Sequence, residues 1–422
     1  WPELNVRRMT RNDFELMAPA GSREAMQAAF QAGADAVYFG VGHLNMRAHA
    51  TRSFTVDDLP ELAALCCEHG AKSYLTINTV MYDDDLADLA VVMEKAKAAG
   101  ISAVIVADVA AMLAARRVGL EVHLSTQLNI ANVEALRFYA QYADVAVLAR
   151  ELTLEQVKRI SEAVVNEPIL GPSGQPIRLE MFCHGALCMA VSGRCYLSEG
   201  TRGKSANRGE CLQTCRREYI VKDKERDIEL EVDNGYIFSP QDLKTIGFLD
   251  RMVEAGVRVF KIEGRARGPE YVRAVVESYS EALTRIAQNR WDEASRTAWD
   301  DKLAQVFNRG FWDGYYLGKP VAELTKTYGS QATEKKVFTG TCLGYYPKAG
   351  MGYFKVQSGP LCVGDTVLVI GPTTGVVKTT IAEMRVNDQP GTVAQKGDEV
   401  TFAVAEKIRV NDKLYRWVSV ER

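Results

Sequence analysis

The chain has 422 residues, 47% of them apolar and 25% charged, which is the usual balance of a soluble globular protein. Its net charge of −3 does not indicate general nucleic-acid binding, although a local basic face would be hidden in that sum. No window approaches the roughly eighteen apolar residues of a membrane span, and the first residues lack the apolar core of a signal peptide. We therefore expect a cytoplasmic protein that binds no membrane.

Up to about residue 318, short apolar runs alternate with segments of helical periodicity. We predict strands at 14–21, 34–40, 71–78, 102–108, 121–129, 144–150, 177–185 and 257–265. We predict helices at 22–33 (with Ser22 as N-cap), 56–70, 83–100, 109–119, 132–143, 152–164 and 239–256, and another that begins near Pro269. Almost continuously apolar strands that alternate with helices indicate a parallel sheet covered on both faces. Seven or eight such units favour an α/β fold of the (β/α)₈ TIM-like barrel type over residues 1–318.

Several predicted strands end in polar residues. These are Asn78, Asp108, Ser125, Thr126, Gln127, Arg150, His184, Glu263 and Arg265. In a barrel, the carboxyl ends of the strands lie on the face where active sites form. Any single one of these residues could instead be a loop cap, but together they predict a site on that face.

The texture of the sequence changes after residue 318. Residues 319–336 are polar and weakly patterned, and we expect them to be a linker. Short β-type runs separated by Gly, Asn and Asp turns then predict a small all-β barrel domain over residues 337–422. Such a domain could bind RNA or a protein partner, or it could brace the main domain.

Four of the nine cysteines fall in one stretch, with the spacing C-x6-C-x15-C-x3-C. They are Cys188, Cys195, Cys211 and Cys215, in a predicted cysteine-rich insertion at about 184–235. Zinc modules usually present two tight cysteine pairs, and only the second pair is tight here. Four thiolates on a glycine-rich loop suit an iron–sulfur cluster. The spacing by itself leaves an iron–sulfur cluster, zinc and structural cysteines open.

Peptidase chemistry has little support among the residues. No two of the five histidines have the zincin H-E-x-x-H spacing, and no G-x-S-x-G motif is present. A nucleophile pair of Cys183 or Cys188 with His184 stays open, although neighbours in a strand point to opposite faces, which argues against Cys183 with His184.

Five ordered motifs in the chain resemble the collagenase-like peptidase family. They are ELMAPAGSREAMQAAFQAGADAVYFG, EMFCHGALCMAVSGRC, NRGECLQTCR, KIEGR and FNRGFWDGYYLG, and they span about Glu15 to Gly318. The family was named for reported collagenase activity. Better understood members are oxygen-independent hydroxylases that act on the wobble uridine of tRNA, on a cytidine of 23S ribosomal RNA, or in ubiquinone synthesis.

The form of the cysteine motif is most similar to the tRNA branch of the family. This resemblance implies a 4Fe-4S cluster, prephenate as co-substrate and donor of the hydroxyl oxygen, and binding to the anticodon region of tRNA, with 5-hydroxyuridine as the product. A collagenase-like peptidase, a hydroxylase of ribosomal RNA and a non-catalytic RNA-binding accessory subunit are the alternatives.

The resemblance also implies roles for particular residues. The expected cluster ligands are Cys188, Cys195, Cys211 and Cys215. The candidate catalytic residues are Glu180, His184, Lys261 and Glu263, of which the first two could instead be structural. An arginine fork suits the two carboxylates of prephenate. The candidates for this binding are Arg47, Arg194 and Arg265, and Arg47 could instead be a solvated surface residue.

Overall fold

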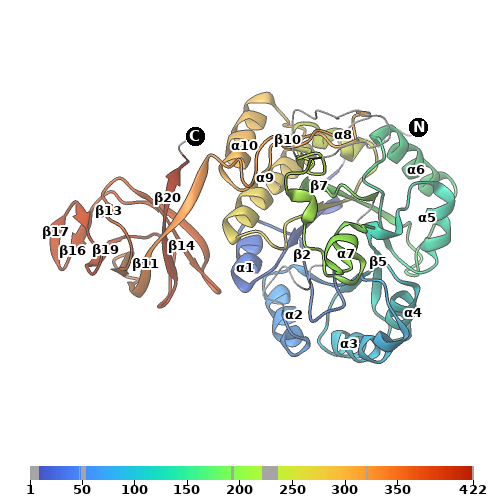
Figure 1. Cartoon of the computed structure of the whole chain (residues 1–422), viewed down its shortest axis with the longest axis horizontal. Helices are drawn as coiled ribbons and strands as arrows, with labels where there is room; N and C mark the ends of the chain where they lie inside the picture. Colours follow the sequence, from blue (N-terminus) through green and yellow to red (C-terminus); the bar gives the residue numbers. More distant parts are fainter. Residues whose placement is uncertain are drawn as a thin grey trace.

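Eight parallel strands close into a barrel in the computed structural model of the chain, which describes residues 9–46, 48, 54–191, 194–220, 236–319 and 322–420 (Figure 1). The barrel strands are β1 (Glu15–Pro19), β2 (Ala36–Phe39), β3 (Lys72–Ile77), β4 (Ala103–Val106), β5 (Glu121–Leu124), β6 (Val145–Val147), β7 (Arg178–Gly185) and β9 (Val259–Ile262). Each strand pairs with the next along the chain, and β9 pairs with both β7 and β1, which closes the ring. The predicted TIM-like barrel is confirmed.

Helices surround the barrel on its outside (Figure 1). They are α1 (Arg23–Gln31), α2 (Leu59–Glu68), α3 (Leu86–Ala98), α4 (Val109–Arg117), α5 (Val133–Ala140), α6 (Leu154–Asn166), α8 (Leu249–Glu254), α9 (Pro269–Ala287) and α10 (Glu293–Gln305). The predicted cap of α1 is confirmed, because the Ser22 hydroxyl accepts a hydrogen bond from the amide of Ala25. Helix α9 begins at Pro269, whose fixed φ suits a first helical turn.

The strands are apolar on both faces because each face is covered. Their outward side chains join those of the helices in one large core, and a smaller interior cluster fills the barrel with residues such as Met17, Tyr38 and Tyr74. Within the described ranges no helix is long and apolar enough to cross a membrane.

The single helix predicted over 239–256 is wrong. Strand β8 (Asp242–Lys244) comes first, followed by a short 3₁₀ turn, and only α8 is helical. Strand β8 lies antiparallel to the end of β7, where His184 is opposite Lys244, and it also pairs with β10 (Phe311–Trp312). The end of β7 projects past the barrel and offers unpaired backbone groups, and pairing with them outweighs the local helical pattern. The predicted strand 121–129 likewise ends at Leu124, before a 3₁₀ turn.

The C-terminal part is all-β, as predicted, and the structure shows that its strands pair antiparallel. Its strands are β11 (Glu334–Tyr346), β12 (Met351–Val356), β13 (Leu361–Cys362), β14 (Thr366–Gly371), β15 (Gly375–Thr380), β16 (Met384–Val386), β17 (Gln389–Gly391), β18 (Val393–Ala394), β19 (Glu399–Ala403) and β20 (Lys413–Ser419). Eight of them form one sheet in the order β15-β14-β20-β11-β12-β19-β16-β17. The limits of the linker, 319–336, stay a prediction.

This β-rich part packs against α1 and α9 on one side of the barrel (Figure 1). Ala28 of α1 lies in a buried apolar cluster with Leu368 and Val376, and the Gln31 side chain donates a hydrogen bond to the carbonyl of Thr374. The contact therefore braces the outside of the barrel.

Candidate active site

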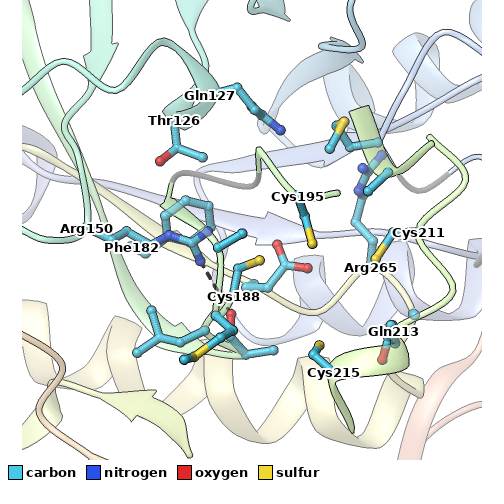
Figure 2. A pocket seen from close by; sticks show the side chains of 18 of the residues that line it. Thr126, Gln127, Arg150, Phe182, Cys188, Cys195, Cys211, Gln213, Cys215 and Arg265 are labelled. Carbon is cyan, nitrogen blue, oxygen red and sulfur yellow. Dashed lines mark hydrogen bonds between the residues drawn. The ribbon is translucent and has the colours of Figure 1, made fainter. Parts of the chain in front are cut away.

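A cavity of about 360 Å³ lies at the carboxyl ends of the barrel strands (Figure 2). Of the polar residues predicted to lie on this face, seven line it: Asn78, Ser125, Thr126, Gln127, Arg150, Glu263 and Arg265. The two others do not. Asp108 caps α4, because its carboxylate accepts the amide of Ala110 at 2.9 Å and that of Met81 at 3.0 Å. Asp108 thus has the loop-cap role that the sequence left open.

The cysteine-rich loop leaves β7 through a turn that requires glycine. Gly185 has a φ of +106°, and a β-carbon there would lie 2.3 Å from the carbonyl oxygen of Glu263. The chain then passes over the mouth of the barrel and brings Cys188, Cys195, Cys211 and Cys215 to the wall of the cavity. Figure 2 shows the four side chains around the same space.

A salt bridge fastens this loop to the segment between β3 and α3. The guanidinium of Arg208 donates to both carboxylate oxygens of Asp85, with one distance of 3.0 Å, and to the carbonyl of Val80. The same guanidinium lies 4.1 Å from the ring centroid of Tyr82. Because Arg208 lies between Cys195 and Cys211, this contact restrains the part of the loop that joins the two cysteines.

The four cavity thiols lie within electrostatic reach of one another. Burial raises the pKa of Cys215, the guanidinium of Arg216 lowers it, and the thiolates of Cys188, Cys211 and Cys195 raise it. Among the described residues, no three His, Cys, Asp or Glu side chains surround the position of one metal ion. The four thiols therefore have the cavity in common, and the charges of the other three act on Cys215.

Cys183 is separate from this group. Its side chain is fully buried in the core and donates a hydrogen bond to the carbonyl of Lys261, and burial raises its pKa well above the usual range. Cys183 and Cys188 are the two cysteines considered as a nucleophile with His184, and of these Cys188 lines the cavity.

Lys261 and Glu180 form a buried ion pair beneath the cavity. The Lys261 ammonium lies 2.9 Å from Oε1 of Glu180 and 4.8 Å from the ring centroid of Tyr38. Lys261 lines the cavity, whereas Glu180 lies deeper and is completely buried. The second carboxylate oxygen of Glu180 is buried with no hydrogen-bond partner in the described chain. Glu180 therefore positions Lys261 and does not reach the cavity itself.

His184 lies outside the cavity. Its ring is buried among Tyr271, Tyr279 and Phe311, and Nδ1 is 3.3 Å from the hydroxyl of Tyr279. Burial, together with the charges of Lys244 and Arg267, lowers its pKa to about 3. A neutral imidazole in this position stabilises the end of β7, which is the structural role that the sequence left open.

The remaining predicted residues divide between the cavity and its surroundings. Glu263 accepts a hydrogen bond from the hydroxyl of Tyr38, and buried Arg265 donates to Oδ1 of Asn45 at 3.1 Å; both line the cavity. Arg194 is exposed, donates to the carbonyl of Gln127 and does not line it. Arg47 lies outside the described residues.

Three arginines of the cavity wall are not among the residues predicted to bind the co-substrate. They are Arg216, Arg267 and Arg309. Arg216 directly follows the last cavity cysteine, Arg267 lies two residues beyond Arg265, and Arg309 belongs to the FNRGFWDGYYLG motif. Their positions within or beside the motifs were the available signal. With Arg150, Lys261 and Arg265 they make the wall strongly cationic, and Glu263 is the one acidic side chain among the lining residues that the structure describes.

Known proteins are similar to this chain over most of its length. A family model described as Peptidase family U32 matches residues 21–326. A Porphyromonas gingivalis protein named collagenase is 54% identical over 409 residues, which cover 97% of this chain and 99% of that protein. The Bacillus subtilis tRNA hydroxylation protein P1 is 32% identical over 377 residues, which cover 87% of this chain and 86% of that protein.

A third relative acts on ribosomal RNA according to its name. The 23S rRNA 5-hydroxycytidine synthase of Escherichia coli is 32% identical over 365 residues, which cover 84% of this chain and 52% of that protein. The family model spans most of the chain and the motifs that build the cavity, and the chain belongs to peptidase family U32.

Proposed function

We propose that the protein is a cytoplasmic, oxygen-independent tRNA hydroxylase that forms 5-hydroxyuridine at the wobble position, with prephenate as hydroxyl donor and a 4Fe-4S cluster as cofactor. The observation that carries the proposal is that four cysteines of one loop line a cationic cavity at the catalytic face of the barrel. The tRNA and ribosomal RNA hydroxylation relatives support the same reaction class.

The donor set suits a cubane cluster. In such a cluster each thiolate binds a different iron, so the four sulfurs stand around a body and not around one point. The thiols of Cys188, Cys195, Cys211 and Cys215 all line one cavity, which supports their use as such a set of ligands. Burial raises the pKa of Cys215, and the charge of Arg216 opposes this rise. The bound cluster would supply one-electron chemistry.

The chain's own residues supply binding and orientation. Arginine and lysine side chains around the cavity suit the two carboxylates of prephenate. Asn78, Thr126 and Gln127 present amide and hydroxyl groups that could bind the polar edge of a base. A base can reach them only when it is unstacked from its neighbours, as in an anticodon loop.

A collagenase-like peptidase is the competing function, favoured by the name of the 54% identical relative. The described histidines give it little support. His43 is exposed near Asp85, His69 stacks on Phe30, and His123 lies inside the barrel beside Glu121. His184 is buried outside the cavity, so none of these four lies beside a cavity cysteine.

The test combines cluster analysis with an RNA assay. We expect anaerobically purified protein to contain iron and sulfide and to form 5-hydroxyuridine in tRNA when prephenate is added, as measured by mass spectrometry of nucleosides. Cys188→Ala and Cys215→Ala should lose both the iron and the product.

The matched control is Cys67→Ala, because Cys67 is exposed on α2 and far from the cavity loop in the chain. Stoichiometric zinc in place of iron, or an unchanged tRNA product in the two cavity variants, would exclude the proposal. Gelatin hydrolysis that Cys188→Ala abolishes and that needs neither iron nor prephenate would establish the peptidase instead.

A further inference from the structure

Arg267 differs from the other cations of the cavity in having no polar partner. Lys261 pairs with Glu180, Arg309 pairs with Asp242 at 3.3 Å, and Arg265 donates to Asn45. Within the described residues, the guanidinium of Arg267 makes neither a hydrogen bond nor an ion pair. It lies against the ring of Phe307, 3.6 Å from the centroid.

The surroundings of Arg267 make the lack of a hydrogen-bond acceptor energetically unfavourable in the ligand-free protein. Arg267 is partly buried, and burial and the neighbouring charge of Arg309 lower its pKa. The acidic groups that face it are Asp242 and Glu263, of which Asp242 is bound by Arg309. A guanidinium that has left much of its water without gaining an acceptor is unfavourable until an anion binds it.

Arg216 is the closest comparison and has a different role. It is also partly buried in the wall, but it donates to Ser239 and to the carbonyls of Pro240 and Leu187. Its charge also interacts with the thiols of Cys215 and Cys188, whereas the largest charge interactions of Arg267 are with Arg309, Asp242, Tyr271 and Glu263. Arg216 therefore offsets thiolate charge, and Arg267 is directed to another anion.

We propose that Arg267, held against Phe307 beside Arg309, binds a carboxylate of the small acidic co-substrate. The identity of that acid as prephenate rests on the proposed function. The existence of the anion subsite does not depend on it. The planar guanidinium offers paired donors that match a carboxylate. Backbone phosphates of RNA are better placed to meet exposed arginines such as Arg194 at the rim.

The test measures binding of prephenate to the anaerobic, cluster-loaded protein by calorimetry. We expect Arg267→Gln to raise the Kd for prephenate by at least about tenfold, and Arg267→Lys to give an intermediate value. The control is Arg116→Gln, because Arg116 also lies over a ring, that of Tyr142, but is exposed outside the cavity. Iron content and circular dichroism show that the variants are folded, and tRNA affinity should be equal in all of them.

The outcomes separate the subsite from the proposed function. Equal prephenate affinity in wild type and Arg267→Gln overturns the subsite and leaves the hydroxylase standing. If Arg267→Gln binds tRNA more weakly but prephenate as tightly as the wild type, the carboxylate subsite is overturned and Arg267 contacts an RNA phosphate instead. The wild-type protein could fail to bind prephenate. In that case, thermal stabilisation by malonate that is lost in Arg267→Gln supports the anion subsite and rejects prephenate as the co-substrate. If malonate does not stabilise the wild type either, the anion subsite and prephenate as co-substrate are both rejected.

Discussion

Buried charges are paired differently at the two ends of the barrel. At the amino ends of the strands, Glu15 accepts hydrogen bonds from Lys72 at 2.7 Å, Arg178 at 2.8 Å and Tyr74 at 2.5 Å. At the carboxyl ends, Arg267 lines the cavity and its guanidinium has no hydrogen bond or ion pair with another residue of the described chain. The buried charges at the amino ends are therefore paired without a ligand, whereas Arg267 at the carboxyl ends is not. The amino ends contribute to stability, and the carboxyl ends are arranged for binding.

The pKa of Glu15 shows how strongly Lys72 and Arg178 stabilise its ionised carboxylate. Burial by itself raises the pKa of this carboxyl group, but the charges of Arg178 and Lys72 together lower it to about 2. The ionised form is therefore strongly favoured in the folded protein. An end of the barrel arranged in this way contributes to stability and needs no change during a reaction.

Glu15→Gln is the substitution for which we expect the largest change in stability. We expect it to lower the free energy of unfolding at pH 7 by about 3 kcal/mol, because two cations lose their carboxylate in a buried site. Urea unfolding followed by circular dichroism measures the change. Prephenate affinity of the folded variant should stay at the wild-type value, and a loss of affinity as large as that of Arg267→Gln would contradict the separation of the two ends.

The pH dependence of stability tests the neutral histidine behind the cavity. The pKa of His184 is about 3 in the folded protein, below its ordinary value, so protonation favours the unfolded chain. Stability is therefore complete above about pH 6.5 and declines as the pH falls toward 3. Between pH 7 and pH 5 we expect a loss of about 2 kcal/mol.

His184→Gln provides the control for this decline, because glutamine does not titrate. Urea unfolding at several pH values should give a flatter profile for this variant than for the wild type. Parallel profiles would show that His184 is accessible to protons in the folded state and that its burial is incomplete.

Arg208→Ala has the smallest expected effect on stability and a selective effect at the cavity. The partly buried pair with Asp85 contributes about 1 kcal/mol to the free energy of unfolding. Because it restrains the loop between two cavity cysteines, its loss should speed the release of iron to a chelator several-fold. Lys204→Ala removes an exposed ion pair with Glu210 in the same loop and should leave this rate unchanged. Equal rates in both variants would contradict the fastening role.

Much of the barrel could be predicted because its pattern is local. Each strand is buried on both faces and each helix on one, and Ser22 precedes a helix whose first amides need an acceptor. The cavity position of Gln127, Arg150 and Arg265 followed from the geometry of a barrel, in which strand ends share one face. The same rule did not reveal that Asp108 and His184 lie outside the cavity, because it does not tell which way a side chain at a strand end points.

The sequence by itself determined the alternation of strands and helices, the all-β character of the last part and the spacing of the four cysteines. Only the tertiary structure decided that residues 242–244 form a strand, since its partners at the end of β7 and in β10 are distant in the chain. It also decided which charges are paired. Glu180 and Lys261 are 81 residues apart, and the isolation of Arg267 is visible only when the whole cavity wall is assembled. Periodicity is a property of neighbouring residues, whereas charge pairing and burial depend on contacts between distant ones.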